Sequence, residues 1–158
     1  MTTLSDRDIL RFMDEGLLVI EDFIESNLTP NGYDLSIEEV YLSSNGARIN
    51  EGTATVDPGK WFAVSTREYF ALSRIINASL WIRTTFARKG IISSFGKVDA
   101  GFEGNLTLTA HNASRSPLYL DIGMRFAQIV FETLSSPPLE DYAKRSGNFQ
   151  GQRGVTLK

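Results

Sequence analysis

Two arginines and two threonines stand close together immediately before a glycine, in the run Arg83-Thr84-Thr85-Phe86-Ala87-Arg88-Lys89-Gly90. Guanidinium groups and hydroxyls donate hydrogen bonds that suit phosphate oxygens, and charge-assisted bonds of this kind are the strong ones. The run is therefore a candidate for binding a phosphate chain. A solvated basic end of a strand has the same composition, so the run is not specific by itself.

An acid and an aromatic residue stand three positions apart in the glycine-flanked turn 99–104. Asp99 can orient a water molecule or bind Mg²⁺ through water, and Phe102 can stack on a sugar. The structural alternative is a turn aspartate beside a core phenylalanine. The turn thus supplies a candidate catalytic carboxylate next to a candidate ligand contact.

The segment 105–111 follows this turn and alternates between polar and apolar residues, which predicts a β-strand with one buried face. Thr107, Thr109 and His111 share the polar face, which leaves it available to a ligand. His111 is the only histidine of the chain. A lone histidine at a strand end is more often a structural or surface residue than a general base.

Two further segments read as a turn followed by a strand, at 31–35 and at 123–131. In a regular strand over the second segment, Arg125 and Gln128 point to opposite sides. After Pro137-Pro138 the chain becomes polar and glycine-rich, with isolated aromatic residues and no periodicity. This tail is either frayed or a lid that becomes ordered over a ligand.

The overall composition narrows the chemistry. Sixteen Lys and Arg against nineteen Asp and Glu give a net charge of −3, which argues against broad attraction to duplex nucleic acid or anionic membranes. The absence of Cys and the single His exclude disulfides, iron–sulfur clusters and zinc sites built from thiolates and imidazoles. The groups that remain available for catalysis or ligand binding are carboxylates, hydroxyls, arginine and a hard cation.

The elements that must position these residues are mostly β-strands. A chain of 158 residues predicts one domain. Only its start looks helical, with Ser5 as the N-cap and Gly16 as the stop. From there to about residue 131, short apolar runs alternate with turns, which favours a sandwich, jelly roll or barrel. Trp61 and Trp81 are expected in the core or at an interface.

In this order, the four segments and the tail resemble the superfamily of dUTPases and dCTP deaminases, in particular its archaeal-type dUTPase branch. The resemblance runs from Leu4-Ser5-Asp6-Arg7-Asp8 to Gln150-Gly151-Gln152. It implies a distorted β jelly roll, the dUTPase-like β-clip, over residues 1–136 and a C-terminal arm over residues 137–158. It also implies a homotrimer with active sites between subunits, in which each arm closes over a neighbouring active site.

The resemblance assigns roles to particular residues. Asp99 matches the acid that positions and activates the water, and Asp34 matches an acid associated with structure or metal. The residues that match phosphate ligands are Arg83, Thr84, Thr85, Arg88, Gln128 and Gln152. The residues that match sugar or base contacts are Phe102, Thr107, Leu108, Thr109 and Phe149. The two threonines replace serines of the family pattern and keep the hydroxyl groups.

Hydrolysis and deamination differ at one position within this resemblance. The deaminases carry a glutamate on the pyrimidine-reading strand, where it shuttles protons during attack at C4 of the base. Thr109 holds that position here, and its hydroxyl does not ionise at neutral pH, so it cannot replace a carboxylate as general base. Glu103 lies six residues upstream, about 20 Å along a strand, and cannot reach the same atom.

We therefore expect a dUTP diphosphohydrolase that converts dUTP and water to dUMP and pyrophosphate by Mg²⁺-assisted water attack at the α-phosphorus. The Mg²⁺ would be held mainly by the triphosphate. The alternatives are a dCTP deaminase, a bifunctional dCTP deaminase and dUTPase, and a non-enzymatic nucleotide-binding trimer. No nucleic-acid or membrane partner is expected. Without an apolar stretch near the ~20 residues that cross a bilayer and without a signal peptide, the chain is expected in the cytoplasm.

Overall fold

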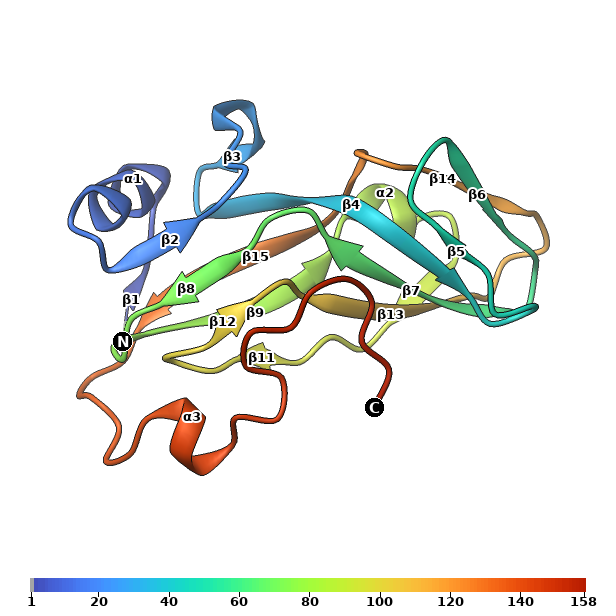
Figure 1. Cartoon of the computed structure of the whole chain (residues 1–158). Coiled ribbons are helices and arrows are strands. Elements are labelled where there is room, and N and C mark those ends of the chain that lie inside the picture. The colour runs from blue at the N-terminus through green and yellow to red at the C-terminus, as the bar shows by residue number, and fades with distance from the viewer. Residues whose placement is uncertain (1) are drawn as a thin grey trace.

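The computed structural model describes residues 2–158. It consists mainly of β-strands, with one N-terminal helix, α1 (Asp6–Asp14), and the one-turn helices α2 (Thr84–Ala87) and α3 (Tyr142–Arg145) (Figure 1). A 3-10 turn spans Glu25–Asn27. Within the described residues, no helix is long and apolar enough to cross a membrane. The prediction of a mostly β fold with a short N-terminal helix is confirmed.

Helix α1 begins and ends at the predicted residues. The Ser5 side chain accepts a hydrogen bond from the Asp8 N–H at 3.2 Å, and the Asp8 carboxylate accepts one from the Ser5 N–H at 3.3 Å, which forms a capping box. These bonds from Ser5 hold the pKa of Asp8 below its ordinary value. Gly16 ends the helix with a φ of 69°, a left-handed conformation that glycine adopts without strain.

One large antiparallel sheet forms the body of the molecule. Its strands lie in the order β10 (Ile91–Ser93), β13 (Thr107–Asn112), β7 (Trp61–Thr66), β4 (Gly32–Leu42), β15 (Arg125–Thr133), β9 (Ile76–Ile82) and β11 (Lys97–Val98). The two outermost strands, β10 and β11, are consecutive in the chain and are joined by residues 94–96. The sheet therefore curls until its two ends meet, as the predicted distorted jelly roll requires (Figure 1).

Shorter strands complete the architecture. β1 (Thr2–Thr3) pairs with β15, and β3 (Leu28–Thr29) and β5 (Arg48–Ile49) pair with β4. A second sheet has the order β12 (Glu103–Gly104), β8 (Phe70–Leu72) and β2 (Leu18–Ile20), and a third consists of β14 (Leu118–Asp121) and β6 (Thr53–Val56). The strands predicted within residues 31–35, 105–111 and 123–131 are present as β4, β13 and β15, whereas β2 and β6 were not predicted from the sequence.

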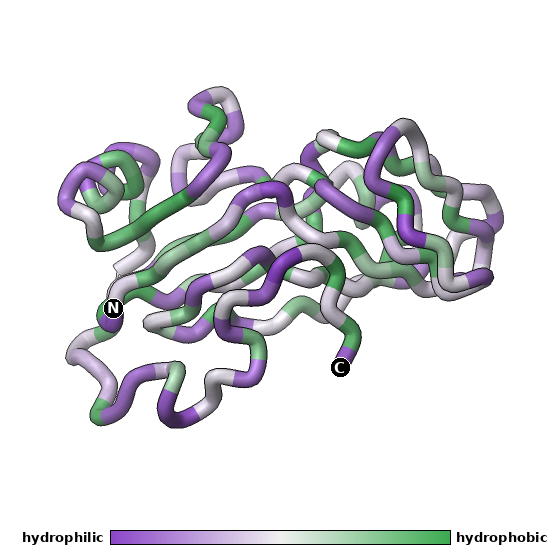
Figure 2. The backbone as a smooth tube through the Cα atoms, in the orientation of Figure 1, coloured by the Kyte–Doolittle hydropathy of each residue, from purple (hydrophilic) through white to green (hydrophobic). Residues whose placement is uncertain are grey.

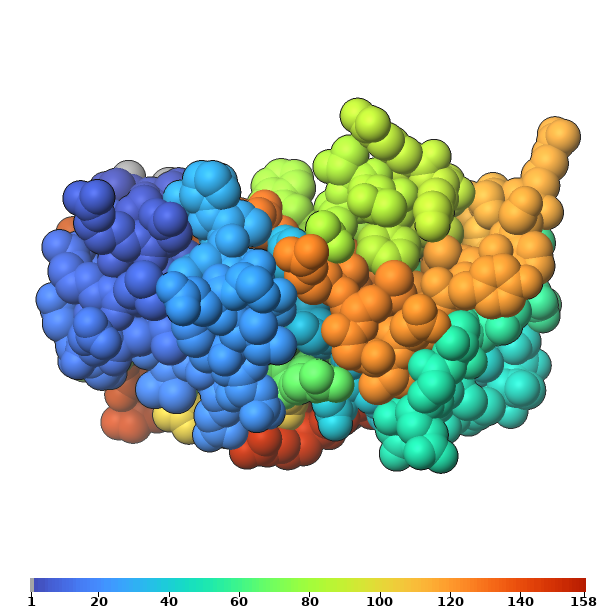
Figure 3. Space-filling view, turned by 90° about the horizontal axis from the view of Figure 1, so that it is seen from above, coloured from blue at the N-terminus to red at the C-terminus, as the bar shows by residue number. Residues whose placement is uncertain are grey.

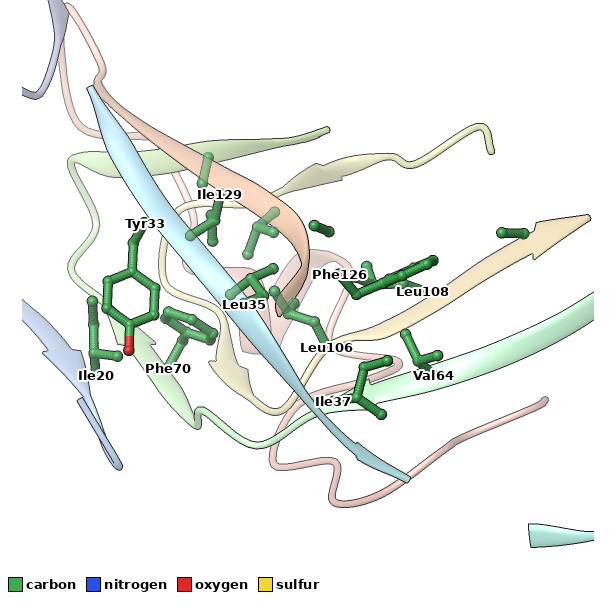
Figure 4. Close-up of a cluster of buried hydrophobic side chains, with 14 of the residues drawn as sticks. Ile20, Tyr33, Leu35, Ile37, Val64, Phe70, Leu106, Leu108, Phe126 and Ile129 are labelled. Carbon is green, nitrogen blue, oxygen red and sulfur yellow. The ribbon is translucent and has the colours of Figure 1, made fainter. Parts of the chain in front are cut away.

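The apolar core lies inside the curl. Figure 4 shows side chains that meet there from strands far apart in the sequence, among them Ile20, Leu35, Phe70, Leu108, Phe126 and Ile129. The tube of Figure 2 is correspondingly green along the central strands and largely purple and white along the C-terminal residues. Tyr33 is fully buried in the core, and this burial raises the pKa of its hydroxyl to about 12.

A carboxylate is also buried, at Glu68, which is inaccessible to solvent. Its two oxygens accept the Ser36 N–H at 3.1 and 3.0 Å. Burial raises the pKa of Glu68 above its ordinary value.

The two tryptophans lie at the surface, where Trp61 is 43% and Trp81 61% exposed. The prediction that they lie in the core is therefore wrong, and a position at an interface stays a prediction.

Candidate active site

A cavity of about 220 Å³ opens beside Asp99, and we call it the Asp99 cavity. It is walled by strands β9 and β11, by the turn before β13 and by the C-terminal arm. Its lining residues are Leu80, Gly96, Lys97, Val98, Asp99, Phe102, Leu106, Thr107, Tyr142, Phe149, Gln152 and Thr156. Among the predicted site residues, the structure therefore brings together Asp99, Phe102, Thr107, Phe149 and Gln152.

The glycine-flanked turn positions Asp99 and Phe102. Asp99 follows β11 directly and is exposed, so its carboxylate is accessible to water. Phe102 is buried and packs edge-on against Tyr142 with 5.8 Å between ring centroids. Gly104 has a φ of 146°, and a Cβ at this position would lie 3.0 Å from the Phe102 ring and 3.2 Å from Gln152. Only glycine allows the turn and the arm to approach this closely.

The cation nearest to Asp99 in the lining is already paired. The Lys97 Nζ lies 2.6 Å from Glu132 Oε2 and 2.6 Å from Asn77 Oδ1. Within the residues that the structure describes, Asp99 is the one carboxylate that lines the cavity. An exposed, unshared carboxylate against apolar and aromatic walls is suited to holding a water molecule.

The three strand residues predicted as base contacts separate in the structure. Leu108 is buried in the core, whereas Thr109 is exposed and lines a different cavity together with Trp61 and His111. Only Thr107 of the three reaches the Asp99 cavity. Strand β10 pairs only with residues 110–112 of β13. Residues 107–109 pair with β7 on one side. On their other side no strand among the described residues pairs with them, so this backbone edge is open.

The C-terminal arm lies against the turn of its own chain. The Gly151 N–H donates to the Glu103 carbonyl at 2.8 Å, and the Asn105 N–H donates to the Gln152 carbonyl at 3.0 Å. The Gln152 Nε2 donates to the Asn105 carbonyl at 2.6 Å, while its Oε1 is buried without a hydrogen-bond partner among residues 2–158. That an arm closes over a neighbouring subunit stays a prediction.

A second group of predicted residues gathers around Asp34. The Arg83 Nε lies 3.1 Å and the Arg125 NH1 3.5 Å from the same Asp34 oxygen. Gln128 pairs directly with Asp34 across β15 and β4, and its side chain donates to the Thr29 hydroxyl at 2.8 Å. We call Asp34, Arg83, Arg125 and Gln128 the Arg83 cluster. Burial raises the pKa of Asp34, and the two guanidinium groups oppose this rise.

A β-bulge corrects one prediction about this cluster. A regular strand would point Arg125 and Gln128 to opposite sides, but the register of β15 against β4 shifts between Arg125 and Ala127. An extra residue in one strand reverses the alternation of its side chains. Arg125 therefore reaches Asp34 on the side where Gln128 also lies. Arg125 is the first residue of β15, but nothing in the sequence pattern reveals the bulge.

The remaining predicted phosphate ligands lie on or beside α2. Thr84, Thr85 and Arg88 are exposed, and the segment that holds them projects from the surface in the view from above (Figure 3, yellow-green). Neither these residues nor the Arg83 cluster line the Asp99 cavity. Gln152 is the exception, since it lies in the cavity and not with the other predicted phosphate ligands. One chain thus carries two separate groups of predicted site residues.

The described residues contain no cluster of metal ligands. Among residues 2–158, no group of three or more Asp, Glu or His residues is placed to hold a metal ion. Mg²⁺ needs few protein ligands when phosphate oxygens supply the rest, typically one or two carboxylates. A single accessible carboxylate at Asp99 fits an ion of that kind.

Comparisons with known proteins agree with this fold. A family model described as "dCTP deaminase-like" matches residues 3–134. The dCTP deaminase of Pyrococcus horikoshii is 40% identical over 136 residues, which cover 85% of each chain. A probable deoxyuridine 5'-triphosphate nucleotidohydrolase of Sulfolobus islandicus rod-shaped virus 1 is 37% identical over 156 residues, which cover 98% of this chain and 96% of the viral protein.

Solved structures match at lower identity and support the fold. The dCTP deaminase of Agrobacterium tumefaciens gives a TM-score of 0.71 at 20% identity over 84% of this chain, which spans about half of that longer chain (49%). A dUTPase from phage phi11 of S. aureus, described with a structural Mg(II) ion, gives 0.55 at 18% identity over 78% of this chain and 95% of the phage chain.

The curled sheet, the Asp99 cavity and the sequence relatives together define a nucleotide-processing enzyme. The chain belongs to the dCTP deaminase-like family. Most of its similar relatives are named dCTP deaminases, and the viral dUTPase stands among them at comparable identity.

Proposed function

We propose that this protein is a dUTP diphosphohydrolase, which converts dUTP and water to dUMP and pyrophosphate. The observation that carries the proposal is the single carboxylate of the Asp99 cavity, exposed and next to Phe102. In the proposed step, Asp99 accepts a proton from a water molecule whose oxygen attacks the α-phosphorus. The bond from that phosphorus to the bridging oxygen breaks, and pyrophosphate leaves. Bound Mg²⁺ would neutralise charge on the triphosphate oxygens.

The Asp99 cavity suits the nucleoside end of the substrate. Its volume of about 220 Å³ is smaller than the roughly 300–1,000 Å³ of pockets that enclose a whole drug-sized ligand. The Phe102 ring can pack on the deoxyribose, and the open backbone edge at 107–109 can pair with the base. The triphosphate must then extend outside the cavity of this chain.

The donors suited to that triphosphate belong to the Arg83 cluster and α2, which lie apart from the cavity. We propose a homotrimer in which the cluster of one subunit faces the Asp99 cavity of the next. The exposed Trp81, which neighbours Gln128 across the sheet, supports a subunit contact on this face because large exposed apolar side chains are common in interfaces.

A second candidate function is dCTP deamination, alone or combined with dUTP hydrolysis. The names of most relatives favour it. Against it stands Thr109, at the position where the family resemblance implies a proton-carrying glutamate. Thr109 lies outside the Asp99 cavity, and its hydroxyl cannot act as a general base at neutral pH.

Two assays on one preparation separate these candidates. We expect pyrophosphate release from dUTP in the presence of Mg²⁺ and no ammonia release from dCTP. Ammonia from dCTP without pyrophosphate from dUTP would replace the proposal with the deaminase. Release of both products would make the enzyme bifunctional, and release of neither, with nucleotide still bound, would leave a non-enzymatic binding protein.

A further inference from the structure

Three polar residues form a row across the strands beneath the end of the arm. Glu39 in β4 pairs with Ser65 in β7, and Ser65 pairs with Thr107 in β13. Residues directly opposite one another in a sheet share a face, so these three side chains point to the same side. The neighbouring row of Val40, Val64 and Leu108 points the other way, into the core.

The arm crosses this row and is hydrogen-bonded at both ends of it. The Glu39 carboxylate accepts the Val155 N–H at 3.1 Å. At the other end, the Thr107 hydroxyl accepts the Thr156 N–H at 3.0 Å and donates to the Gly154 carbonyl at 3.4 Å. Residues 154–156 are therefore held by side chains of two different strands.

Arg48 completes the attachment from the adjoining strand β5. Its NH1 donates to the Val155 carbonyl at 3.0 Å and to the Glu39 carboxylate at 2.8 Å. The Val155 N–H is thus bound by the Glu39 carboxylate and the Val155 C=O by the Arg48 guanidinium group. These two side chains also pair with each other. Val155 is only 5% exposed, while its neighbours along the arm are half-buried or exposed.

The middle of the row makes no such bond. Ser65 is fully buried, and its hydroxyl has no hydrogen-bond partner among residues 2–158. Ser65 is therefore a control position in the same row, where removal of the hydroxyl breaks no hydrogen bond to the arm.

We propose that Glu39, Arg48 and Thr107 are positioning residues that dock residues 154–156 and so hold the arm over the Asp99 cavity. Gln152 and Phe149, which line the cavity, stand only a few residues before this dock. Glu39 and Arg48 do not line the cavity, so they act on the site through the arm. The family resemblance assigns Thr107 to base contacts, whereas its hydroxyl is here engaged with the arm. The catalytic consequence rests on the proposed hydrolysis of dUTP, but the docking itself does not.

The test compares Arg48→Met and Glu39→Gln with two matched controls. Glu38→Gln removes a neighbouring acid of β4 that accepts a hydrogen bond from Arg67 at 3.2 Å and, among residues 2–158, makes none with the arm. Ser65→Ala removes the unpartnered hydroxyl. The first readout is amide hydrogen exchange of residues 154–157 without nucleotide. We expect at least about tenfold faster exchange in Arg48→Met, a smaller increase in Glu39→Gln, and no change in either control.

The second readout is the KM for dUTP, which we expect to rise about tenfold in Arg48→Met while kcat at saturating dUTP stays close to the wild-type value. Equal exchange in Arg48→Met, Glu39→Gln and Glu38→Gln would overturn the docking proposal whatever the kinetics. Faster exchange in the first two variants, with no dUTP hydrolysis by any protein including the wild type, would keep the dock and refute the proposed function. Should Arg48→Met fold poorly, Glu39→Gln carries the same comparison.

Discussion

The Asp99 cavity and the Arg83 cluster each contain one aspartate at their centre, in opposite surroundings. Asp99 is exposed, and no guanidinium group lines its cavity among the described residues. Asp34 is 5% exposed and shares one oxygen between Arg83 and Arg125. An aspartate carboxylate is thus accessible to water in the Asp99 cavity, and in the Arg83 cluster it is buried and held by two arginines.

This difference indicates a division of labour. An accessible carboxylate can exchange protons with water, whereas a buried one with two cations keeps those cations in place. Asp34 holds two arginines side by side, and their remaining N–H groups are available to phosphate oxygens. The Asp99 cavity has no guanidinium group in its described lining, and the Asp34 carboxylate of the Arg83 cluster is buried. We therefore expect the two regions to act as halves of one site.

The largest effect is expected from Asp99→Asn, which removes the proton acceptor and keeps the size of the side chain. We expect turnover of dUTP to fall at least ~100-fold, the scale of losing a general base, with nucleotide binding largely retained. Steady-state kinetics together with calorimetric binding of a non-hydrolysable dUTP analogue measures both quantities. Turnover comparable to that of the wild type would remove Asp99 from the mechanism.

Substitution in the Arg83 cluster should act on binding more than on chemistry. We expect Arg83→Met to lower kcat/KM for dUTP by about 100-fold, and Arg83→Lys, which keeps the charge but not the planar fork, by about tenfold. Arg11→Lys on helix α1, which alters an exposed pair with Asp8, is the control. If all three variants behave alike, the cluster does not bind the triphosphate.

Glu68 sharpens the contrast between buried and exposed carboxylates, because it is buried and makes no ion pair with residues 2–158. Its raised pKa means that the folded protein holds this proton more tightly than the unfolded chain does. The stabilising contribution is therefore complete below about pH 4.5, the ordinary value, and is lost as the pH rises through the raised pKa. We expect the free energy of unfolding of Glu68→Gln, relative to wild type, to increase with pH by up to about 1.4 kcal/mol per unit in that window. Urea unfolding across this range measures it, and a constant difference would show that Glu68 does not titrate there.

The smallest effect is expected from Thr109→Glu, which restores a carboxylate at the position where the two reactions of the family differ. Residue 109 shares a face of β13 with Thr107, which lines the Asp99 cavity, and glutamate reaches farther than threonine. We therefore expect slow but detectable ammonia release from dCTP, with dUTP hydrolysis retained. Thr109→Gln, which has nearly the same size and no charge, should release none. Absence of ammonia in both variants would mean that deamination needs further groups from this chain.

Local chemistry made some of the structure predictable. Ser5 and Gly16 delimit helix α1 because capping and left-handed geometry depend on single residue types, and alternation alone predicts β13. The bulge that turns Arg125 toward Asp34 was not predictable, since it depends on the register between two strands. The same holds for Arg48, which reaches Val155 across more than a hundred residues of sequence. Contacts of that kind follow from the sheet order, which no local pattern contains.

In the proposed trimer, one working site combines the Asp99 cavity of one subunit with the Arg83 cluster of another. The most direct test is to refold the two impaired variants Asp99→Asn and Arg83→Met together at equal amounts and to measure pyrophosphate release at a dUTP concentration below the KM of the wild type. Shared sites predict recovery to about a quarter of the wild-type rate, because half of the cavities and half of the clusters are intact and they combine at random. A mixture no more active than the separate variants would contradict the claim.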